Sequence, residues 1–307
     1  MSLGRKTLFM MILLVLVFAG TDFFIQRNII FPTFIDIEQK SAQTNIDRVI
    51  EVFGSSISQL DITNHDWAAW DDTYQFIQDA NHEYIESNLT QESYYNGKLN
   101  FIFYLDLDNK LVWGEVWDIV EEIEITSNLF IEQALSLLVP KIALISNKDE
   151  LPKKGVQGIY IQEGMPILFS IRPIITTKNT GPIKGHLIQA RFIDSRVIEE
   201  YIKQTKVKFT ITPITTISSS KDINTYQIKE LDRATLEVSK KIISNNSPVL
   251  KITTLFPRDV SKNGLDSIQY ALTTTLLVGL LSIITAWLLL RATIISPILS
   301  LTNHALK

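Results

Sequence analysis

The sequence contains no cysteine and only four histidines, at positions 65, 82, 186 and 304. The missing cysteines exclude disulfide frameworks, thiolate metal sites and cysteine nucleophiles. The histidines lack metal-site spacing, and the sequence has no nucleophile elbow, phosphate-binding glycine loop or metalloprotease helix motif. There is no basic block, and the net charge is −4, which argues against nucleic-acid binding. We therefore expect no metal, no cofactor and no catalytic set.

Long apolar runs are plentiful in this chain of 307 residues, of which 46 % are hydrophobic. The first run begins at Leu8, directly after Arg5 and Lys6, and it is long enough for a transmembrane helix over residues 7–26. A cleavable signal peptide is the alternative. That alternative needs a small-x-small cleavage site, and the site around Ala19 is a poor one.

The second run, from Tyr270 to Leu290, carries no charged residue. It predicts a transmembrane helix over residues 269–290, with a buried core helix as the alternative. Basic residues flank the outer ends of both runs, which predicts that both termini are cytoplasmic. The expected order is a cytoplasmic N-terminus at 1–6, a membrane helix at 7–26, an extracytoplasmic domain at 27–268, a membrane helix at 269–290 and a linker at 291–307. We therefore expect a two-pass protein of the inner (plasma) membrane with a periplasmic domain.

Between the two runs, the pattern changes from helical to strand-like. Apolar residues recur at spacings of about four and three from Ile46 to Tyr74, which predicts a long helix whose seam is interrupted by Asn64 and Asp71. Strands are expected at 101–105, 111–116, 156–162, 167–175, 184–192, 207–213 and 249–255, and helices at 123–144 (stopped or kinked at Pro140), 195–205 and 231–243. The fold class is therefore α+β, with an antiparallel sheet and helices on one side of it.

The run His65–Tyr74 holds the densest group of chemically useful side chains. On a helix, Trp67, Trp70, Asp71 and Tyr74 share a face. Two aromatic planes, a phenol and a carboxylate can line a small ligand pocket with one fixed charge. The alternative is that these side chains only complete the core.

Two arginines near strand ends add positive charge, Arg172 before Pro173 and Arg191 at the end of its strand. Each guanidinium could pair with Asp71 or with an anionic ligand, and pairing with an internal acid is favoured. The helical seam also offers a surface for a homodimer, although the same residues could pack on the domain's own sheet instead.

Three segments resemble the signature of the fourth type of CHASE domain, an extracytoplasmic sensory module of bacterial and archaeal receptors. They are His65–Tyr74 with Asn81, Tyr84 and Asn88 after it, then Gly181–Arg191, which is similar to the family's closing strand, and Phe256–Val260 before the second span. The resemblance covers roughly residues 40–265 and implies a PAS-like or Cache-like sensor fold. In such receptors the sensor is joined to histidine kinase, diguanylate cyclase or phosphodiesterase domains, as in two-component or cyclic-di-GMP signalling.

The segment Ile295–Leu306 resembles the opening helix of a HAMP linker, with Pro297 and Leu301 in the family's positions. The resemblance implies that this chain is the input half of a receptor, without the catalytic output domain. We predict that a small molecule binds between the long helix and the sheet and that the signal passes through the second span. The predicted ligand-binding residues are Trp67, Trp70, Asp71, Tyr74, Arg172 and Arg191. The alternatives are a membrane-anchored extracytoplasmic enzyme and a passive adhesin.

Overall fold

The computed structural model describes residues 3–145, 155–179, 182–214, 225–245 and 247–297. The chain divides into two compact units. The first, here called the helical unit, comprises Met1–Ala42, Glu230–Leu236 and Phe256–Lys307. The second, here called the sheet unit, comprises Gln43–Lys229 and Glu237–Leu255.

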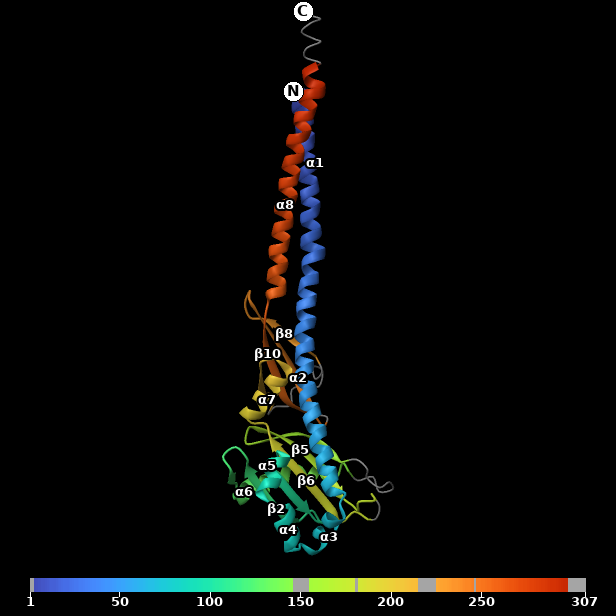
Figure 1. Cartoon of the computed structure of the whole chain (residues 1–307), viewed down its shortest axis with the longest axis vertical. Coiled ribbons are helices and arrows are strands. Elements are labelled where there is room, and N and C mark those ends of the chain that lie inside the picture. The colour runs from blue at the N-terminus through green and yellow to red at the C-terminus, as the bar shows by residue number, and fades with distance from the viewer. Residues whose placement is uncertain (1–2, 146–154, 180–181, 215–224, 246, 298–307) are drawn as a thin grey trace, which may run out of the picture. The chain divides into compact units, whose positions relative to one another are not determined.

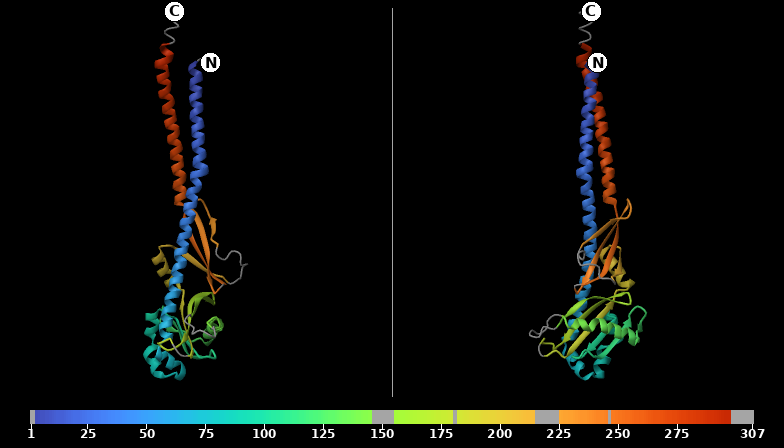
Figure 2. Two further views of the ribbon diagram at one scale, coloured as in Figure 1. Left: turned by 90° about the vertical axis from the view of Figure 1, so that its right-hand side faces the viewer. Right: turned by 180° about the vertical axis from the view of Figure 1, so that it is seen from behind.

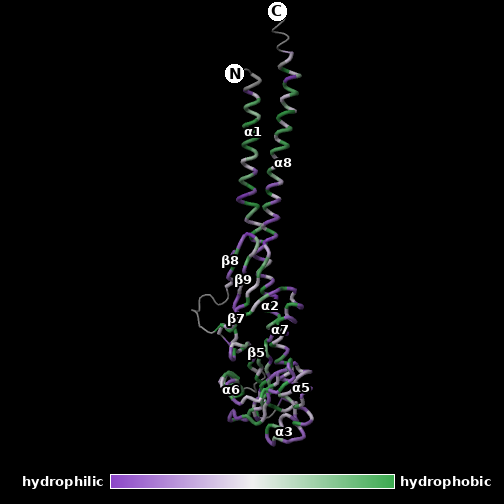
Figure 3. Tube along the Cα trace, turned by 90° about the vertical axis from the view of Figure 1, so that its left-hand side faces the viewer, coloured by the Kyte–Doolittle hydropathy of each residue, from purple (hydrophilic) through white to green (hydrophobic). Residues whose placement is uncertain are grey.

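Both predicted apolar runs are helical. Helix α1 (Leu3–Ile25) continues through a π-helical turn, η1 (Gln26–Ile30), into α2 (Phe31–Ala68), and α8 (Asp259–Leu290) ends in a second π-helical turn, η2 (Arg291–Ile295). Helices α1 and α8 lie side by side (Figures 1 and 2). Their hydrophobic stretches are evident in Figure 3, and the most apolar 18-residue window of each helix is not buried within the protein. Such windows suit an apolar solvent such as the bilayer core.

The sheet unit is built on a six-stranded antiparallel sheet in the order β3-β2-β1-β6-β5-β4. Its strands are β1 (Phe101–Leu105), β2 (Leu111–Asp118), β3 (Ile123–Glu124), β4 (Val156–Gln162), β5 (Met165–Ile174) and β6 (Gly185–Phe192). The predicted hairpin and the three consecutive strands after it are confirmed. In the hairpin turn, Asn109 adopts a left-handed conformation with φ 61°, and the backbone N–H of Lys110 donates to Asp106.

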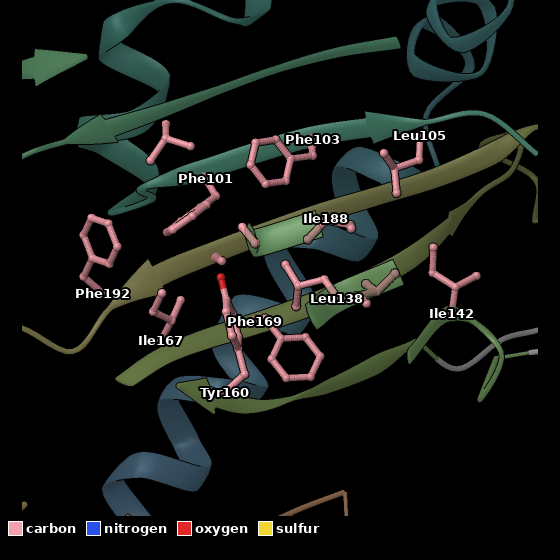
Figure 4. Packing of buried hydrophobic residues seen from close by; sticks show 14 of the residues in the cluster. Phe101, Phe103, Leu105, Leu138, Ile142, Tyr160, Ile167, Phe169, Ile188 and Phe192 are labelled. Carbon is pink, nitrogen blue, oxygen red and sulfur yellow. The ribbon is translucent and has the colours of Figure 1, made fainter. Parts of the chain in front are cut away.

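Helices cover both faces of this sheet, so the prediction of helices on one side is wrong. On one face, α6 (Asn128–Ile142) packs Leu138 against Phe103 and Phe169 in a buried apolar cluster (Figure 4). On the other face, where α2 passes, Asn64 donates to strand β5 at Ser170. Because side chains alternate along a strand, Phe169 and Ser170 point to opposite faces, and each face has its own helical cover.

Helix α6 begins later than predicted and is not stopped by its proline. Ser127 caps it by accepting a hydrogen bond from the backbone N–H of Phe130, and Ile123 belongs to strand β3 instead. Pro140 lies in the last turn, and the helix ends two residues later, at Ile142.

A second sheet, in the order β7-β10-β9-β8, follows α7 (Ser195–Thr205). Its strands are β7 (Phe209–Pro213), β8 (Gln227–Glu230), β9 (Thr235–Ser244) and β10 (Ser247–Pro257). Strand β9 replaces the helix predicted at 231–243, so that prediction is wrong. Leu236, Val238 and Ile242 are buried at even positions, which is the two-residue period of a strand.

The seam of α2 packs within the protein's own fold. Ile46, Phe53 and Leu60 are buried, and the Phe53 ring meets the ring of Tyr201 edge-on at 4.9 Å. Of the two uses foreseen for this seam, packing on the chain's own domain is therefore the one that the structure shows.

Candidate functional site

The predicted long helix breaks at Trp70, within the densest group of side chains. Helix α2 ends at Ala68, Trp70 is extended with φ −127° and ψ 135°, and α3 (Asp71–Asp79) begins after it. Asp71 and Asp72 lie in the first turn of α3, where carboxylates are stabilised by the helix dipole. The run therefore divides between two helices, and its side chains do not share one helix face.

A tight turn joins α3 to α4 (His82–Asn88). Ala80 is left-handed with φ 49°, and Asn81 caps α4 by accepting a hydrogen bond from the N–H of Tyr84 at 2.9 Å. The Asn81 amide also donates to the Asp79 carboxylate at 2.7 Å, and this lowers the pKa of Asp79. These contacts fix the angle between the two helices.

A cleft of about 440 Å³ opens between these helices, and we call it the α3–α4 cleft. Its walls hold two aromatic rings, two carboxylates and several amide or hydroxyl groups. The lining residues are Trp70, Asp72, Gln75, Asn81, Glu83, Tyr84, Ser87 and Asn88. No lysine or arginine is among these lining residues, so the described walls carry negative formal charge at neutral pH.

Tyr84 lies at the base of the α3–α4 cleft, where stacking and hydrogen bonds hold its side chain. Its ring stacks on Phe76 at 4.4 Å, and its hydroxyl is within hydrogen-bond distance of the Thr73 hydroxyl (2.6 Å) and the Tyr104 hydroxyl (3.1 Å). Burial, and to a lesser extent the negative charge of Asp72, raises the pKa of Tyr84. Trp70 lies 5.9 Å from Tyr84, ring centre to ring centre. This arrangement suits a small ligand that stacks on a ring and carries hydrogen-bond donors or positive charge.

Trp70 is the only one of the six predicted site residues among those described as lining the α3–α4 cleft. Asp71 is exposed and exchanges two hydrogen bonds with Thr177, accepting from its backbone N–H at 2.9 Å and donating its own N–H to the hydroxyl at 3.1 Å. The Tyr74 hydroxyl donates to the carbonyl of Pro182 at 3.1 Å. Trp67 is half-buried in the last turn of α2.

Arg172 pairs with Asp61 of α2, where the sequence had suggested Asp71 as a partner. Its Nε donates to Asp61 Oδ1 at 2.7 Å, a second nitrogen contacts Oδ2, and the Ser170 hydroxyl donates to Oδ1 at 2.8 Å. Next to this pair, the buried Asn64 amide donates to the Ser170 carbonyl (2.9 Å), the Ser170 hydroxyl (3.0 Å) and the Leu187 carbonyl (3.2 Å). Asn64, the polar residue that interrupts the apolar seam, thus links α2 to the sheet through hydrogen bonds.

Arg191 contacts a different acid, Glu200 of α7, at 3.3 Å. Although partial burial works to raise the pKa of Glu200, the charges of Lys98 and Arg191 lower it overall. Both predicted arginines therefore pair with an acid of the chain itself, as the sequence favoured. Neither of these acids is Asp71.

The sequence did not single out Tyr84 or Glu83 as site residues. Asn81 was a usable signal, because an asparagine just before a short helix is a common cap. The cleft itself depends on the left-handed Ala80, and alanine gives no warning of such a turn. Within the described ranges, which omit 146–154, 180–181, 215–224, 246 and both chain ends, no cluster of three or more acidic or histidine side chains could hold a metal ion. Ser218–Ser220, which the sequence favours as loop residues and not as a nucleophile, lie outside the described residues.

Comparison with known proteins gives three kinds of match. The family model described as "CHASE4 domain" matches residues 52–212, just over half of the chain. A curated relative, the methanogenesis regulatory histidine kinase FilI of Methanothrix harundinacea, is 24 % identical over 283 residues. The match covers 90 % of this chain and 31 % of that relative, so the chain spans about a third of its length.

Among solved structures, the chain is similar to the periplasmic domain of Vibrio cholerae LuxQ, with 13 % identity and a TM-score of 0.45. That match covers 70 % of this chain and 97 % of the LuxQ domain. The ligand-binding domain of the Campylobacter jejuni chemoreceptor Tlp3, solved with L-valine, is 11 % identical with a TM-score of 0.45, over 76 % of this chain and 98 % of that domain. The family match, together with the antiparallel sheet and the two apolar helices, leads to one conclusion. The chain belongs to the CHASE4 domain family and is the sensory region of a membrane signalling receptor.

Proposed function

We propose that the sheet unit detects a small molecule outside the cytoplasm and reports it through α8. The chain would cross the inner (plasma) membrane twice, with both termini in the cytoplasm, since Arg5, Lys6 and Arg291 flank the outer ends of the spans. The relative FilI is a histidine kinase, which supports a histidine kinase output joined to this region. A diguanylate cyclase or phosphodiesterase is the other output that the family resemblance implies.

A HAMP-like linker at 291–307 would carry the signal from α8 to the output domain. Residues 298–307 lie outside the described part of the chain, so the proposal rests there on the sequence likeness around Pro297 and Leu301. The proposal also includes a homodimer. Because the α2 seam is buried in the chain's own fold, the dimer would use another face.

The proposed ligand site is the α3–α4 cleft, and the observation that carries it is the composition of its walls. Asp72 and Glu83 supply negative charge, the half-buried Trp70 supplies a ring, the buried Tyr84 forms the base, and the described lining includes no lysine or arginine. An ammonium group placed between the rings and the carboxylates would gain both cation–π and ionic attraction. We therefore assign the ligand to small organic amines.

Of the six residues predicted from the sequence, Trp70 would contact the ligand directly. Asp71 and Tyr74 would act indirectly, by holding Thr177 and Pro182 beside α3. Arg172 and Arg191 would hold the sheet to α2 and α7 through their carboxylate partners. Trp67 would support the break between α2 and α3 from the last turn of α2.

Signalling requires the ligand to prefer one of two packings of the helices, since equal affinity for both packings shifts nothing. Trp70 lies at the break between α2 and α3 and also lines the cleft. A ligand that draws Trp70 toward Tyr84 would therefore change the direction in which α3 leaves α2. A shift of about 1 to 2 Å in α2 is the usual size of such a signal.

Thermal denaturation of the full chain in lipid nanodiscs tests the ligand assignment. Choline, ethanolamine and putrescine serve as amine probes, and acetate and succinate serve as carboxylate probes. A ligand at about 100 times its dissociation constant stabilises by about 2.7 kcal/mol. For a domain of this size, that shifts the melting temperature by about 5 to 10 °C.

The variant Asp72→Asn/Glu83→Gln should melt near the wild-type temperature and lose the response to the amine. Glu86→Gln is the matched control. Glu86 is an exposed acid on α4, as Glu83 is, but it contacts His82 and is absent from the described lining of the cleft. A shift with carboxylates and none with amines would reject the proposed ligand class. An equal amine response in wild type and in the cleft variant would reject the cleft.

A further inference from the structure

The junction between strand β10 and helix α8 lies in the helical unit and lacks a cap of its own. Strand β10 ends at Pro257 and α8 begins at Asp259. Arg258 stands between them with φ −88° and ψ 42°, and its side chain makes no capping hydrogen bond to α8. The first backbone N–H groups of a helix have no acceptor within the helix, so a junction of this kind needs an acceptor from elsewhere.

Glu38 of α2 supplies that acceptor. Its carboxylate accepts from the Ser261 backbone N–H at 3.2 Å, from the Ser261 hydroxyl at 2.6 Å and from Arg258 Nε at 3.3 Å. Glu38 is only 4 % exposed, and the Arg258 side chain 11 %. Three donors stabilise this buried carboxylate, and removing them would leave a buried charge unpaired, which costs free energy. We call Glu38, Arg258 and Ser261 the Glu38 clasp.

Arg258 extends the clasp to the hairpin between β8 and β9. Its Nη1 lies 2.9 Å from the Glu230 carboxylate, and its backbone N–H donates to the Ala234 carbonyl at 2.8 Å. Glu230–Leu236 belongs to the same compact unit as the clasp. The start of α8 is therefore fixed to α2 and to this hairpin at once.

Further contacts continue from the clasp along α8 in antiparallel order. A Cβ at Gly264 would lie 2.6 Å from the Phe34 ring, and the Thr275 hydroxyl donates to Asp22 at 3.1 Å. At Gly279, a Cβ would lie 2.6 Å from Val15 Cγ1. The two helices pack closely at these points, so the clasp sits at one end of a continuous helix pair.

We propose that Glu38 is the positioning residue that sets the register of α8 against the α1–α2 helix. The β10–α8 junction would otherwise absorb a displacement of α2 by rotating about Arg258. With the Glu38 clasp formed, α2 and the start of α8 move together, and the displacement reaches the membrane-spanning part of α8. This role is independent of the ligand's identity and of the α3–α4 cleft.

Disulfide cross-linking of the full chain in lipid nanodiscs tests this role. The distance from Val15 Cβ to a Cβ built at Gly279 is 3.7 Å, which is within the range that a disulfide needs. The chain has no cysteine of its own, so within one chain Val15→Cys/Gly279→Cys is the only pair that can form, and its product is separated by mass from a cross-linked dimer. The measured quantity is the rate of disulfide formation under a fixed mild oxidant.

Adding Glu38→Ala or Ser261→Ala to this pair should slow cross-linking at least about fivefold, the low end of ordinary coupling between sites. Glu38→Gln, which keeps an acceptor for Ser261 and loses the charge opposite Arg258, should give an intermediate rate. Asp36→Asn is the matched control, because Asp36 is an exposed acid on the same helix paired with Lys40, and it should leave the rate unchanged.

A stabilising role without a positioning role gives a different result. In that case Glu38→Ala and Ser261→Ala would lower the melting temperature while the cross-linking rate stayed at the wild-type value, and the proposal would be overturned. Ser261→Ala leaves the Glu38–Arg258 charge pair in place, so it provides a folded variant if Glu38→Ala does not fold.

Discussion

The Asp61–Arg172 pair offers a quantitative test of how α2 is held to the sheet. The two side chains are 13 % and 12 % exposed, and the Asp61 carboxylate accepts from Arg172 Nε at 2.7 Å and from the Ser170 hydroxyl at 2.8 Å. Asp61→Asn keeps the shape of the side chain and removes its charge. The Arg172 guanidinium would then stay largely buried without its carboxylate, which costs about 3 kcal/mol or more.

For a domain of about 200 residues, a loss of about 3 kcal/mol lowers the melting temperature by about 6 to 12 °C. The assay is thermal unfolding of the full chain in nanodiscs, followed by circular dichroism. Asp66→Asn is the matched control, since Asp66 is exposed on the same helix, and its loss should cost at most about 0.5 kcal/mol.

The double variant Asp61→Leu/Arg172→Met should recover most of the lost stability, because a buried ion pair replaced by apolar side chains of similar volume is often neutral. Equal melting temperatures for Asp61→Asn and Asp66→Asn would show that the Asp61–Arg172 pair does not hold α2 to the sheet. If the double variant were less stable than Asp61→Asn, the pair would contribute more to stability than the neutralisation of each buried charge by the other.

Three further predictions concern buried polar groups and a helix cap. Gln189 is fully buried on the face of the sheet opposite α6, and among the described residues neither its amide nitrogen nor its amide oxygen has a hydrogen-bond partner. Gln189→Met should therefore raise the free energy of unfolding by about 1 kcal/mol in urea denaturation. Asn81→Ala should lower the free energy of unfolding by about 1 kcal/mol, because the α4 cap is lost. Asn81→Ser can still cap the helix and should retain most of the stability. Equal losses of stability in the two variants would contradict the capping role. Burial lowers the pKa of His186 to about 4, while the unfolded chain takes up the proton near pH 6.5, so acidification from pH 6.5 to 4 should cost about 3 kcal/mol of stability. His186→Gln should flatten that part of the pH profile, His82→Gln should not, and an unchanged profile in His186→Gln would show that other groups dominate the acid response.

Local periodicity was sufficient for much of the fold. The hairpin at Phe101 and the strand at Val156 follow from runs of strand-forming residues bounded by turn residues. The two long apolar helices follow from the length of the apolar runs and their scarcity of charge. Strand β9 was not predicted, because Lys240 and Lys241 interrupt its alternation of apolar and polar residues. Only its pairing in the second sheet shows that Leu236 and Val238 are buried on a strand.

The candidate site was harder to predict, because it depends on tertiary placement. The run from His65 to Tyr74 keeps a helical phase on both sides of the break at Trp70, so the sequence gives no sign of the extended residue there. The partner of Arg172 is distant in sequence, since Asp61 precedes it by 111 residues. Pairing at such distances depends on how α2 lies on the sheet, which no local pattern encodes.

In the topology that we propose, the α3–α4 cleft faces the outside of the cell, and two membrane helices separate it from the cytoplasm. Labelling of single introduced cysteines in intact cells tests it most directly, since the chain has none of its own. A membrane-impermeant maleimide should label Ser87→Cys, at the rim of the cleft, in intact cells, and Thr293→Cys, beyond α8, only after the membrane is permeabilised. Labelling of Ser87→Cys only after permeabilisation would contradict the account.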